Sequence, residues 1–204
     1  MQPRLRGQRQ IAAGTRASAG QPHPRENREG LGREHRGTAL STIMIPTITQ
    51  LPTEKKLVGQ RLSMSATADR TPELWRSFMP RRKEIKHTLG TDLFNVKIYQ
   101  PGHFEQFSPQ SLFEKWAAVE VAHFEEIPDG MEALTLPAGL YAIFFYQGSS
   151  ADPRIYQYIF GEWLPNSKEY ALDDRPHFDL LGEKYRSNDP ASEEEIWIPI
   201  RLKA

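Results

Sequence analysis

The chain has 204 residues with 26 basic and 26 acidic side chains and contains no cysteine. This length allows one domain with a tail and a buried core. The lack of cysteine excludes disulfide bonds, thiolate metal sites and cysteine nucleophiles. No apolar run approaches the roughly 18 residues that a membrane-spanning helix needs, and no secretory signal is apparent. We therefore expect a soluble, cytoplasmic protein with no membrane contact.

The N-terminal segment, residues 1–43, differs in composition from the rest of the chain. It contains eight Arg, no Lys and three Glu, with repeated Gly, Gln and Pro. Such a segment buries too little apolar surface to offset its ordering entropy, so we predict a disordered basic tail. It resembles an organelle transit peptide poorly. Because Met44 stands directly before the first apolar residues, we interpret the tail as an upstream extension of a domain at 44–204.

The predicted domain has a different charge from the tail. Residues 44–204 hold 18 basic and 23 acidic side chains, so their net charge is about −5. Domains that bind nucleic acid usually carry a positive surface. We therefore expect no specific nucleic-acid binding by this domain.

Hydrophobic periodicity predicts four elements in the first half of the domain. The helix has Thr71 as its capping residue and Pro72 in its first turn, and it should end at Gly90. Pro80 should kink this helix or divide it. In order, the elements are a strand at 56–65, a helix up to residue 89, and strands at 93–99 and 114–121.

The second half repeats the same order of elements. A strand at 140–146 is followed by a helix at 152–164 and by strands at 176–183 and 192–200. We therefore predict an α+β fold made of a tandem pair of strand-helix-strand-strand modules. A pseudo-twofold axis should relate the modules and leave a cleft between them, which is a common place for ligands.

The last predicted strand carries the strongest candidate site. Alternation places Glu195 and Trp197 on one face and Ile196 on the other. A carboxylate and a large aromatic ring about 6–7 Å apart along a strand suit a flat cationic or polarised organic molecule. The alternative is an ordinary edge strand with a solvated acidic end, and we interpret Glu193 and Glu194 as that end.

Four short motifs together resemble a known family. They are Leu136-Pro137-Ala138-Gly139-Leu140-Tyr141-Ala142, Trp163-Leu164-Pro165-Asn166-Ser167, Arg175-Pro176-His177-Phe178 and Glu195-Ile196-Trp197-Ile198-Pro199-Ile200. In order and spacing they resemble the GyrI-like small-molecule-binding family, which includes effector-binding domains of AraC-type and MerR-type multidrug-responsive regulators. The resemblance covers about residues 45–202. No helix-turn-helix is found in 44–204, so the chain resembles the stand-alone form.

The resemblance implies a fold and a set of site residues. The family fold is the tandem pair of modules predicted above, and its ligands are lipophilic cations bound in an aromatic-lined cleft. Glu195 corresponds to the family's glutamate at the floor of that cleft, and Tyr141 and Trp163 correspond to cleft-facing aromatics. Trp197 would add a further ring. Trp116 and Glu120 stand on the equivalent strand of the first half and complete the candidate set, although an ordinary core role is open for Trp116.

Two other functions are open. Some stand-alone relatives hydrolyse reactive cyclopropane-bearing compounds, and Glu195 could supply the acid/base group if its pocket raised its pKa. A protein-interaction module of the gyrase-inhibitor type is the second alternative. We expect no cofactor and no metal site, because His103, His123 and His177 are too scattered to form one.

Overall fold

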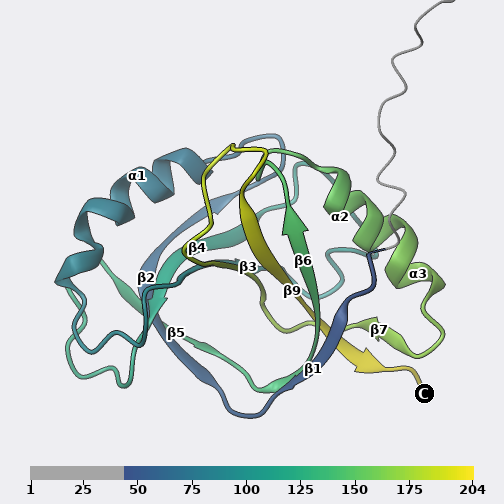
Figure 1. The fold of residues 1–204 in the computed structure, drawn as a ribbon, viewed down its shortest axis with the longest axis horizontal. Coiled ribbons are helices and arrows are strands. Elements are labelled where there is room, and N and C mark those ends of the chain that lie inside the picture. Colours follow the sequence, from purple (N-terminus) through teal and green to yellow (C-terminus); the bar gives the residue numbers. More distant parts are fainter. Residues whose placement is uncertain (1–43) are drawn as a thin grey trace, which may run out of the picture. The chain divides into compact units, whose positions relative to one another are not determined.

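The computed structural model describes residues 44–204, and the predicted tail at 1–43 lies outside the described residues. Nine strands form an antiparallel sheet with helices on its outer side (Figure 1). The order within the sheet is β1-β6-β9-β8-β3-β4-β2-β5, and β7 pairs with β9. The strands are β1 Thr47–Leu51, β2 Lys55–Met64, β3 Leu93–Ile98, β4 Phe113–Glu120, β5 Glu132–Leu136, β6 Gly139–Gln147, β7 Tyr170–Leu172, β8 His177–Leu181 and β9 Glu193–Leu202.

Two helical segments connect strands of this sheet. The first consists of α1, Thr71–Arg81, followed by a 3₁₀ turn at Arg82–Glu84. The second is a continuous helical run made of α2, Arg154–Tyr158, a π-helical turn at Ile159–Trp163, and α3, Leu164–Asn166. The α+β fold class is therefore confirmed. Among the described residues, no helix has the length and apolar character needed to cross a bilayer.

The two halves of the domain have similar but unequal orders of elements. The first half runs β2, α1, β3, β4, and the second runs β6, the second helical segment, β7, β8, β9, so the short strand β7 has no counterpart. In the first half β2, β4 and β3 are neighbours, and in the second half β6, β9 and β8 are neighbours. The halves meet where β3 pairs with β8, in a register that sets Asn95 opposite Asp179 and Lys97 opposite His177. The centre of the sheet is therefore also the line between the halves.

Two short connections curl the sheet. Only residues 52–54 join β1 to β2, and only residues 137–138 join β5 to β6. In each case the joined strands belong to opposite ends of the sheet. Because so few residues reach only roughly 10–15 Å, the two ends must approach each other. The sheet therefore has an inner face, which it wraps around, and an outer face, which carries the helices.

The core consists of one inner cluster and two outer clusters. The inner cluster takes side chains from both ends and the centre of the sheet: Leu51, Leu57, Phe94, Val96, Trp116, Ala118, Leu136, Tyr141 and Phe178. On the outer face, Leu74 and Phe78 of α1 cover the first half. Ile155 and Ile159 of the second helical segment cover the other half. The line between the halves is left without a helix.

The predicted strands and the second helix are confirmed, but the prediction for the first helix is partly wrong. Helix α1 ends at Arg81 and does not continue to Leu89. Pro80 has no N–H to donate to the preceding turn, which weakens the helix at this point. His87 then adopts a left-handed backbone with φ of 58°, which a continuing helix cannot contain. Leu89 is consequently half exposed.

Thr71 does not cap this helix as predicted. Arg70 precedes the helix and supplies no capping side chain. The backbone N–H and hydroxyl of Thr71 both donate to a carboxylate oxygen of Asp69. The same hydroxyl accepts a hydrogen bond from Lys115 Nζ at 2.6 Å, so Thr71 connects α1 to β4.

Candidate ligand-binding site

A large hollow lies on the outer face of the sheet, at the line between the halves. We call it the junction cleft; its volume is about 950 Å³. Residues of both α1 and α2 line it, and Figure 1 shows these two helices apart from each other, on opposite sides of the view. Lining side chains come from α1 (Thr71, Trp75, Met79), β3 (Leu93, Asn95, Lys97), β4 (Phe113, Lys115), α2 (Tyr156), β8 (Asp179, Leu181), β9 (Glu194) and the loop residues 182, 183 and 185–188.

The floor of the junction cleft is polar. Lys97 Nζ donates to both carboxylate oxygens of Asp179, at 2.9 and 2.7 Å, and to the hydroxyl of Tyr156 at 2.8 Å. Tyr156 and the amide of Asn95 also donate to Asp179, at 3.0 and 2.7 Å. Lys97 and Asp179 are buried, so this network fixes the floor by charge-assisted hydrogen bonds. The network occupies all three Lys97 donors.

Strand alternation explains why polar side chains reach this floor. In β3, Phe94 and Val96 point into the inner cluster, so Asn95 and Lys97 must point to the outer face. Cross-strand partners share a face, so Asp179 of β8 joins Asn95. The centre of the sheet is thus apolar inside and charged outside.

Glu194 of β9 adds a second carboxyl to the cleft. Its side chain is only 9% exposed. In residues 44–204 no side chain lies within hydrogen-bonding or ion-pairing distance of its carboxyl group. Burial, together with the charge of Asp179, raises the pKa of Glu194 to about 7, although Lys97 and Lys115 act in the opposite direction. Glu194 is therefore a buried acid without a partner at the edge of an open cleft.

The walls above this floor are largely aromatic. Trp75 of α1 and Tyr156 of α2 stand on the two sides, and Tyr99, Phe113 and Tyr185 complete the ring-bearing lining. Trp75 is half-buried and packs edge-on against Phe78 at 6.0 Å between ring centroids. Flat rings around a polar floor suit an amphipathic organic molecule.

The structure places Glu195 and Trp197 on the inner face, not in the junction cleft. They share a face as predicted, and the Trp197 indole Nε1 donates to Glu195 Oε2 at 2.9 Å. Trp197 stacks on Phe178 with centroids 5.0 Å apart. Glu195 lines a smaller hollow of about 480 Å³ beside Phe145. Its carboxyl is therefore already engaged by the predicted aromatic partner.

Tyr141 and Trp116 belong to the closed inner cluster. Tyr141 is fully buried and Trp116 is 3% exposed. Glu120 lies at the far end of β4, where it accepts hydrogen bonds from Lys55 Nζ at 2.9 and 3.0 Å. None of the three lines the junction cleft.

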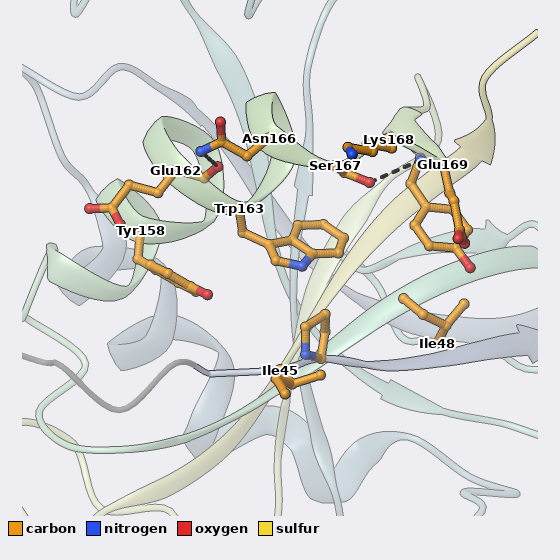
Figure 2. A pocket seen from close by; sticks show the side chains of 11 residues that line it. Ile45, Ile48, Tyr158, Glu162, Trp163, Asn166, Ser167, Lys168 and Glu169 are labelled. Carbon is orange, nitrogen blue, oxygen red and sulfur yellow. Dashed lines mark hydrogen bonds between the residues drawn. The ribbon is translucent and has the colours of Figure 1, made fainter.

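Trp163 lies in a separate pocket of about 570 Å³ beside the start of β1. Figure 2 shows its ring between the second helical segment and the chain that carries Ile45 and Ile48. The ring also packs edge-on against Phe144 at 5.1 Å. We call this hollow the Trp163 pocket, and its lining includes Tyr158, Glu162 and Tyr170. The six predicted site residues are therefore distributed over several places.

The sequence held signals for the junction cleft that the prediction did not use. Asn95 and Lys97 interrupt the outer face of a strand whose inner face is strictly apolar. Glu194 shares its face with Ile196 and Ile198, which is a core pattern. The interpretation of Glu194 as part of a solvated end was therefore wrong, because Ile196 continues into the core beside it.

The structure shows the surroundings of His177, one of the three histidines considered as metal ligands. His177 is buried against Tyr99 and Phe104, and burial together with the charge of Lys97 lowers its pKa to about 3. Within residues 44–204 no group of three His, Cys, Asp or Glu side chains is arranged to hold a metal ion.

Comparison with known proteins identifies the family. A family profile described as Cass2, integron-associated effector binding protein, matches residues 47–200. The chain belongs to this family. The resemblance to effector-binding domains is therefore confirmed.

The chain is similar in sequence to part of a transcriptional regulator. The transcriptional regulator BrlR of Pseudomonas aeruginosa is 29% identical over 153 residues, which cover 71% of this chain and 51% of BrlR. The chain thus spans about half the length of that relative.

Two solved structures share the fold of this effector-binding domain. SAV2435 bound to tetraphenylphosphonium has a TM-score of 0.53 at 16% identity, covering 78% of this chain and 94% of SAV2435. The integron cassette protein VCH_CASS2 of Vibrio cholerae has a TM-score of 0.54 at 12% identity, covering 76% of this chain and 95% of that protein.

Proposed function

We propose that residues 44–204 bind a small amphipathic organic molecule in the junction cleft. The observation that carries the proposal is Glu194, a buried carboxyl with no partner in the described chain at the edge of a cleft of about 950 Å³. A buried polar group without a partner is unfavourable unless a ligand or water satisfies it. Membership of an effector-binding family supports the same conclusion.

We further propose that the ligand carries a positive charge that pairs with Glu194. A cation beside this carboxyl would favour its ionised form and gain an interaction shielded from water. Trp75, Tyr99 and Tyr156 would contact the rest of the ligand, and each cation–π contact adds roughly 0.5–2 kcal/mol. The tetraphenylphosphonium in SAV2435, a charge surrounded by four rings, is a ligand of this kind. Flat walls of this type predict broad specificity.

Selective blocking of two hollows tests where such a ligand binds. Thr91 is exposed and lines the junction cleft, so Thr91→Trp would obstruct it. Lys168 is exposed and lines the Trp163 pocket, so Lys168→Trp is the matched control. Calorimetric titration with tetraphenylphosphonium should give the same Kd for the natural chain and Lys168→Trp.

The Thr91→Trp variant should bind at least tenfold more weakly. Equal affinity of all three proteins, or a loss confined to Lys168→Trp, would remove the junction cleft from the proposal. If the natural chain does not bind tetraphenylphosphonium, the proposal that the ligand is a cation fails. Circular dichroism before titration checks that each variant is folded.

We also propose that a pseudo-twofold axis between β3 and β8 relates the two halves. Two observations support this proposal. The order of elements is similar apart from the short strand β7, and the last strand of each half, β4 or β9, lies between two other strands of the same half. Superposing backbone atoms of one half on the other tests the proposal. Such a relation would put the junction cleft on the symmetry axis.

Hydrolysis of a reactive compound stays a second prediction, although the acid/base residue expected from the sequence was Glu195, which does not line the junction cleft. With a pKa of about 7, Glu194 is the carboxyl in the cleft best suited to acid/base work, because proton transfer is efficient near the operating pH. Incubation with a cyclopropane-bearing compound followed by mass spectrometry should then show addition of water. Recovery of the unchanged compound leaves binding alone. The interaction with a protein partner and the cytoplasmic location also stay predictions.

A further inference from the structure

The junction cleft contains a second group that a purely cationic ligand would leave unmatched. Lys97 and Lys115 are direct cross-strand partners on β3 and β4, so their ammonium groups share the outer face. Lys97 pairs with Asp179. Within residues 44–204 no carboxylate lies within 4.0 Å of Lys115 Nζ.

The hydrogen bonding of Lys115 is incomplete. Its ammonium donates only to the Thr71 hydroxyl among the described residues, at 2.6 Å, which leaves two of its three N–H donors. Thr71 donates in turn to Asp69, which is exposed and therefore well solvated. Burial and the neighbouring Lys97 lower the pKa of Lys115 to about 8, as expected for a partly buried ammonium that has no carboxylate partner.

Lys115 also lies at a border between two hollows. It lines the junction cleft and a second hollow of about 570 Å³, which we call the side hollow. Tyr99, Phe113 and Tyr156 are shared by the two linings, and Phe104 and Phe107 line only the side hollow. A ligand could therefore extend past Lys115 from one aromatic compartment into the other.

The overall charge of the cleft is balanced, which argues against a ligand with a single charge. Its lining contains four basic and four acidic side chains: Arg82, Lys97, Lys115 and Arg186, and Asp69, Asp179, Glu183 and Glu194. A ligand with one cation would neutralise Glu194 and add repulsion to Lys115. A ligand with one charge of each sign would match both unpaired groups.

We propose that the ligand of the junction cleft is amphoteric, with an acidic group such as a carboxylate bound by Lys115 and a cationic group bound by Glu194. The inference rests on the proposed function, because it assigns a second contact within the same cleft. It narrows the ligand class from lipophilic cations to aromatic molecules that also carry an acid.

Two phosphonium compounds of nearly equal shape test this inference. Pentyltriphenylphosphonium carries only the cation, whereas (4-carboxybutyl)triphenylphosphonium ends the same chain in a carboxylate. Calorimetric titrations at pH 7 should give a lower Kd for the carboxylate compound with the natural chain. Lys115→Met should weaken binding of the carboxylate compound about tenfold and leave or improve binding of the pentyl compound.

Two further variants control this experiment. Lys184→Met removes the same charge from an exposed ion pair with Glu193 and should keep the natural preference. Lys115→Arg keeps the charge and should retain most of the preference if Lys115→Met proves unstable.

The outcomes separate the two proposals. If both compounds bind with equal affinity and Lys115→Met changes neither, the amphoteric ligand is excluded while binding in the cleft stands. If neither compound binds the natural chain, the proposed function itself fails. A preference that persists in Lys115→Met assigns the acidic group to another residue and overturns the role of Lys115.

Discussion

Two consecutive glutamates on β9 have opposite environments. Glu194 points to the outer face, is 9% exposed and has no partner in the described chain. Glu195 points to the inner face, is half-buried and accepts a hydrogen bond from Trp197. The same type of side chain thus has no protein partner on one face and accepts a hydrogen bond on the other.

The difference follows from the two-residue period of a strand. A shift of one residue moves a side chain to the other face of the sheet. The outer face at Glu194 opens into the junction cleft, whereas Glu195 lines the smaller hollow beside Phe145 and accepts a hydrogen bond from Trp197. Position relative to the cleft, not residue type, therefore decides which glutamate is available to a ligand.

We expect the largest effect on stability from a substitution in the polar floor of the junction cleft. Asp179→Asn leaves the Lys97 ammonium buried without its carboxylate, so we expect a loss of about 3–5 kcal/mol in the free energy of unfolding. Urea denaturation measures this loss. The double replacement Lys97→Met with Asp179→Leu should recover much of it, because neither charge is then buried.

An exposed ion pair gives the control for this variant. Glu193→Gln breaks the exposed pair between β9 and Lys184 of the loop after β8, and it should change the free energy by at most about 1 kcal/mol. If Asp179→Asn and Glu193→Gln lowered the free energy of unfolding equally, the floor of the junction cleft would be well solvated.

Glu194 on the outer face should make the free energy of unfolding depend on pH. The expected change is about 3 kcal/mol, because a tenfold change in proton affinity corresponds to roughly 1.4 kcal/mol. The pKa of Glu194 is raised from 4.5 to about 7 in the folded state, so the folded chain keeps a proton that the unfolded chain releases. The free energy of unfolding should therefore fall as pH rises from about 4.5 to about 7.

Variants at both glutamates isolate this contribution. Glu194→Gln should lack the fall, so its stability relative to the natural chain rises between pH 4 and pH 8. Glu195→Gln should retain the fall that Glu194 causes. Urea denaturation at pH 4, 5.5 and 8 measures all three proteins, and parallel curves for Glu194→Gln and the natural chain would contradict the burial of Glu194.

The smallest expected effect is on the inner face. Trp197→Phe keeps a ring against Phe178 but removes the donor to Glu195. We expect a loss of about 1 kcal/mol in the free energy of unfolding, the usual contribution of one hydrogen bond, with unchanged affinity for tetraphenylphosphonium. A large loss of affinity would instead return the binding site to the inner face.

The sequence predicted most of the fold because its strands alternate strongly. Residues 93–98 and 113–120 show an apolar face that a sheet requires, and their strands are confirmed. The edge strands β1 and β5 were not predicted, since five-residue strands with mixed burial give a weak periodic signal. The early end of α1 depends on Pro80 and on the backbone of His87, which only the structure reveals.

The site was harder to predict than the fold for a physical reason. Both faces of β9 carry large apolar residues, Ile196 and Ile198 outside and Trp197 inside, so alternation alone cannot tell a packed face from an open one. The cleft exists because neither helix covers the line where β3 meets β8. That pairing joins residues at least 80 positions apart and is not encoded in any local pattern.

The affinity of tetraphenylphosphonium for Glu194→Gln and Glu195→Gln at pH 8 tests the central claim most directly. At this pH Glu194 is ionised in the folded chain, so its loss should raise the Kd about tenfold, which corresponds to roughly 1.4 kcal/mol. Glu195→Gln should bind within twofold of the natural chain. The reverse ranking, or equal affinity of all three proteins, would contradict the assignment of the junction cleft as the binding site.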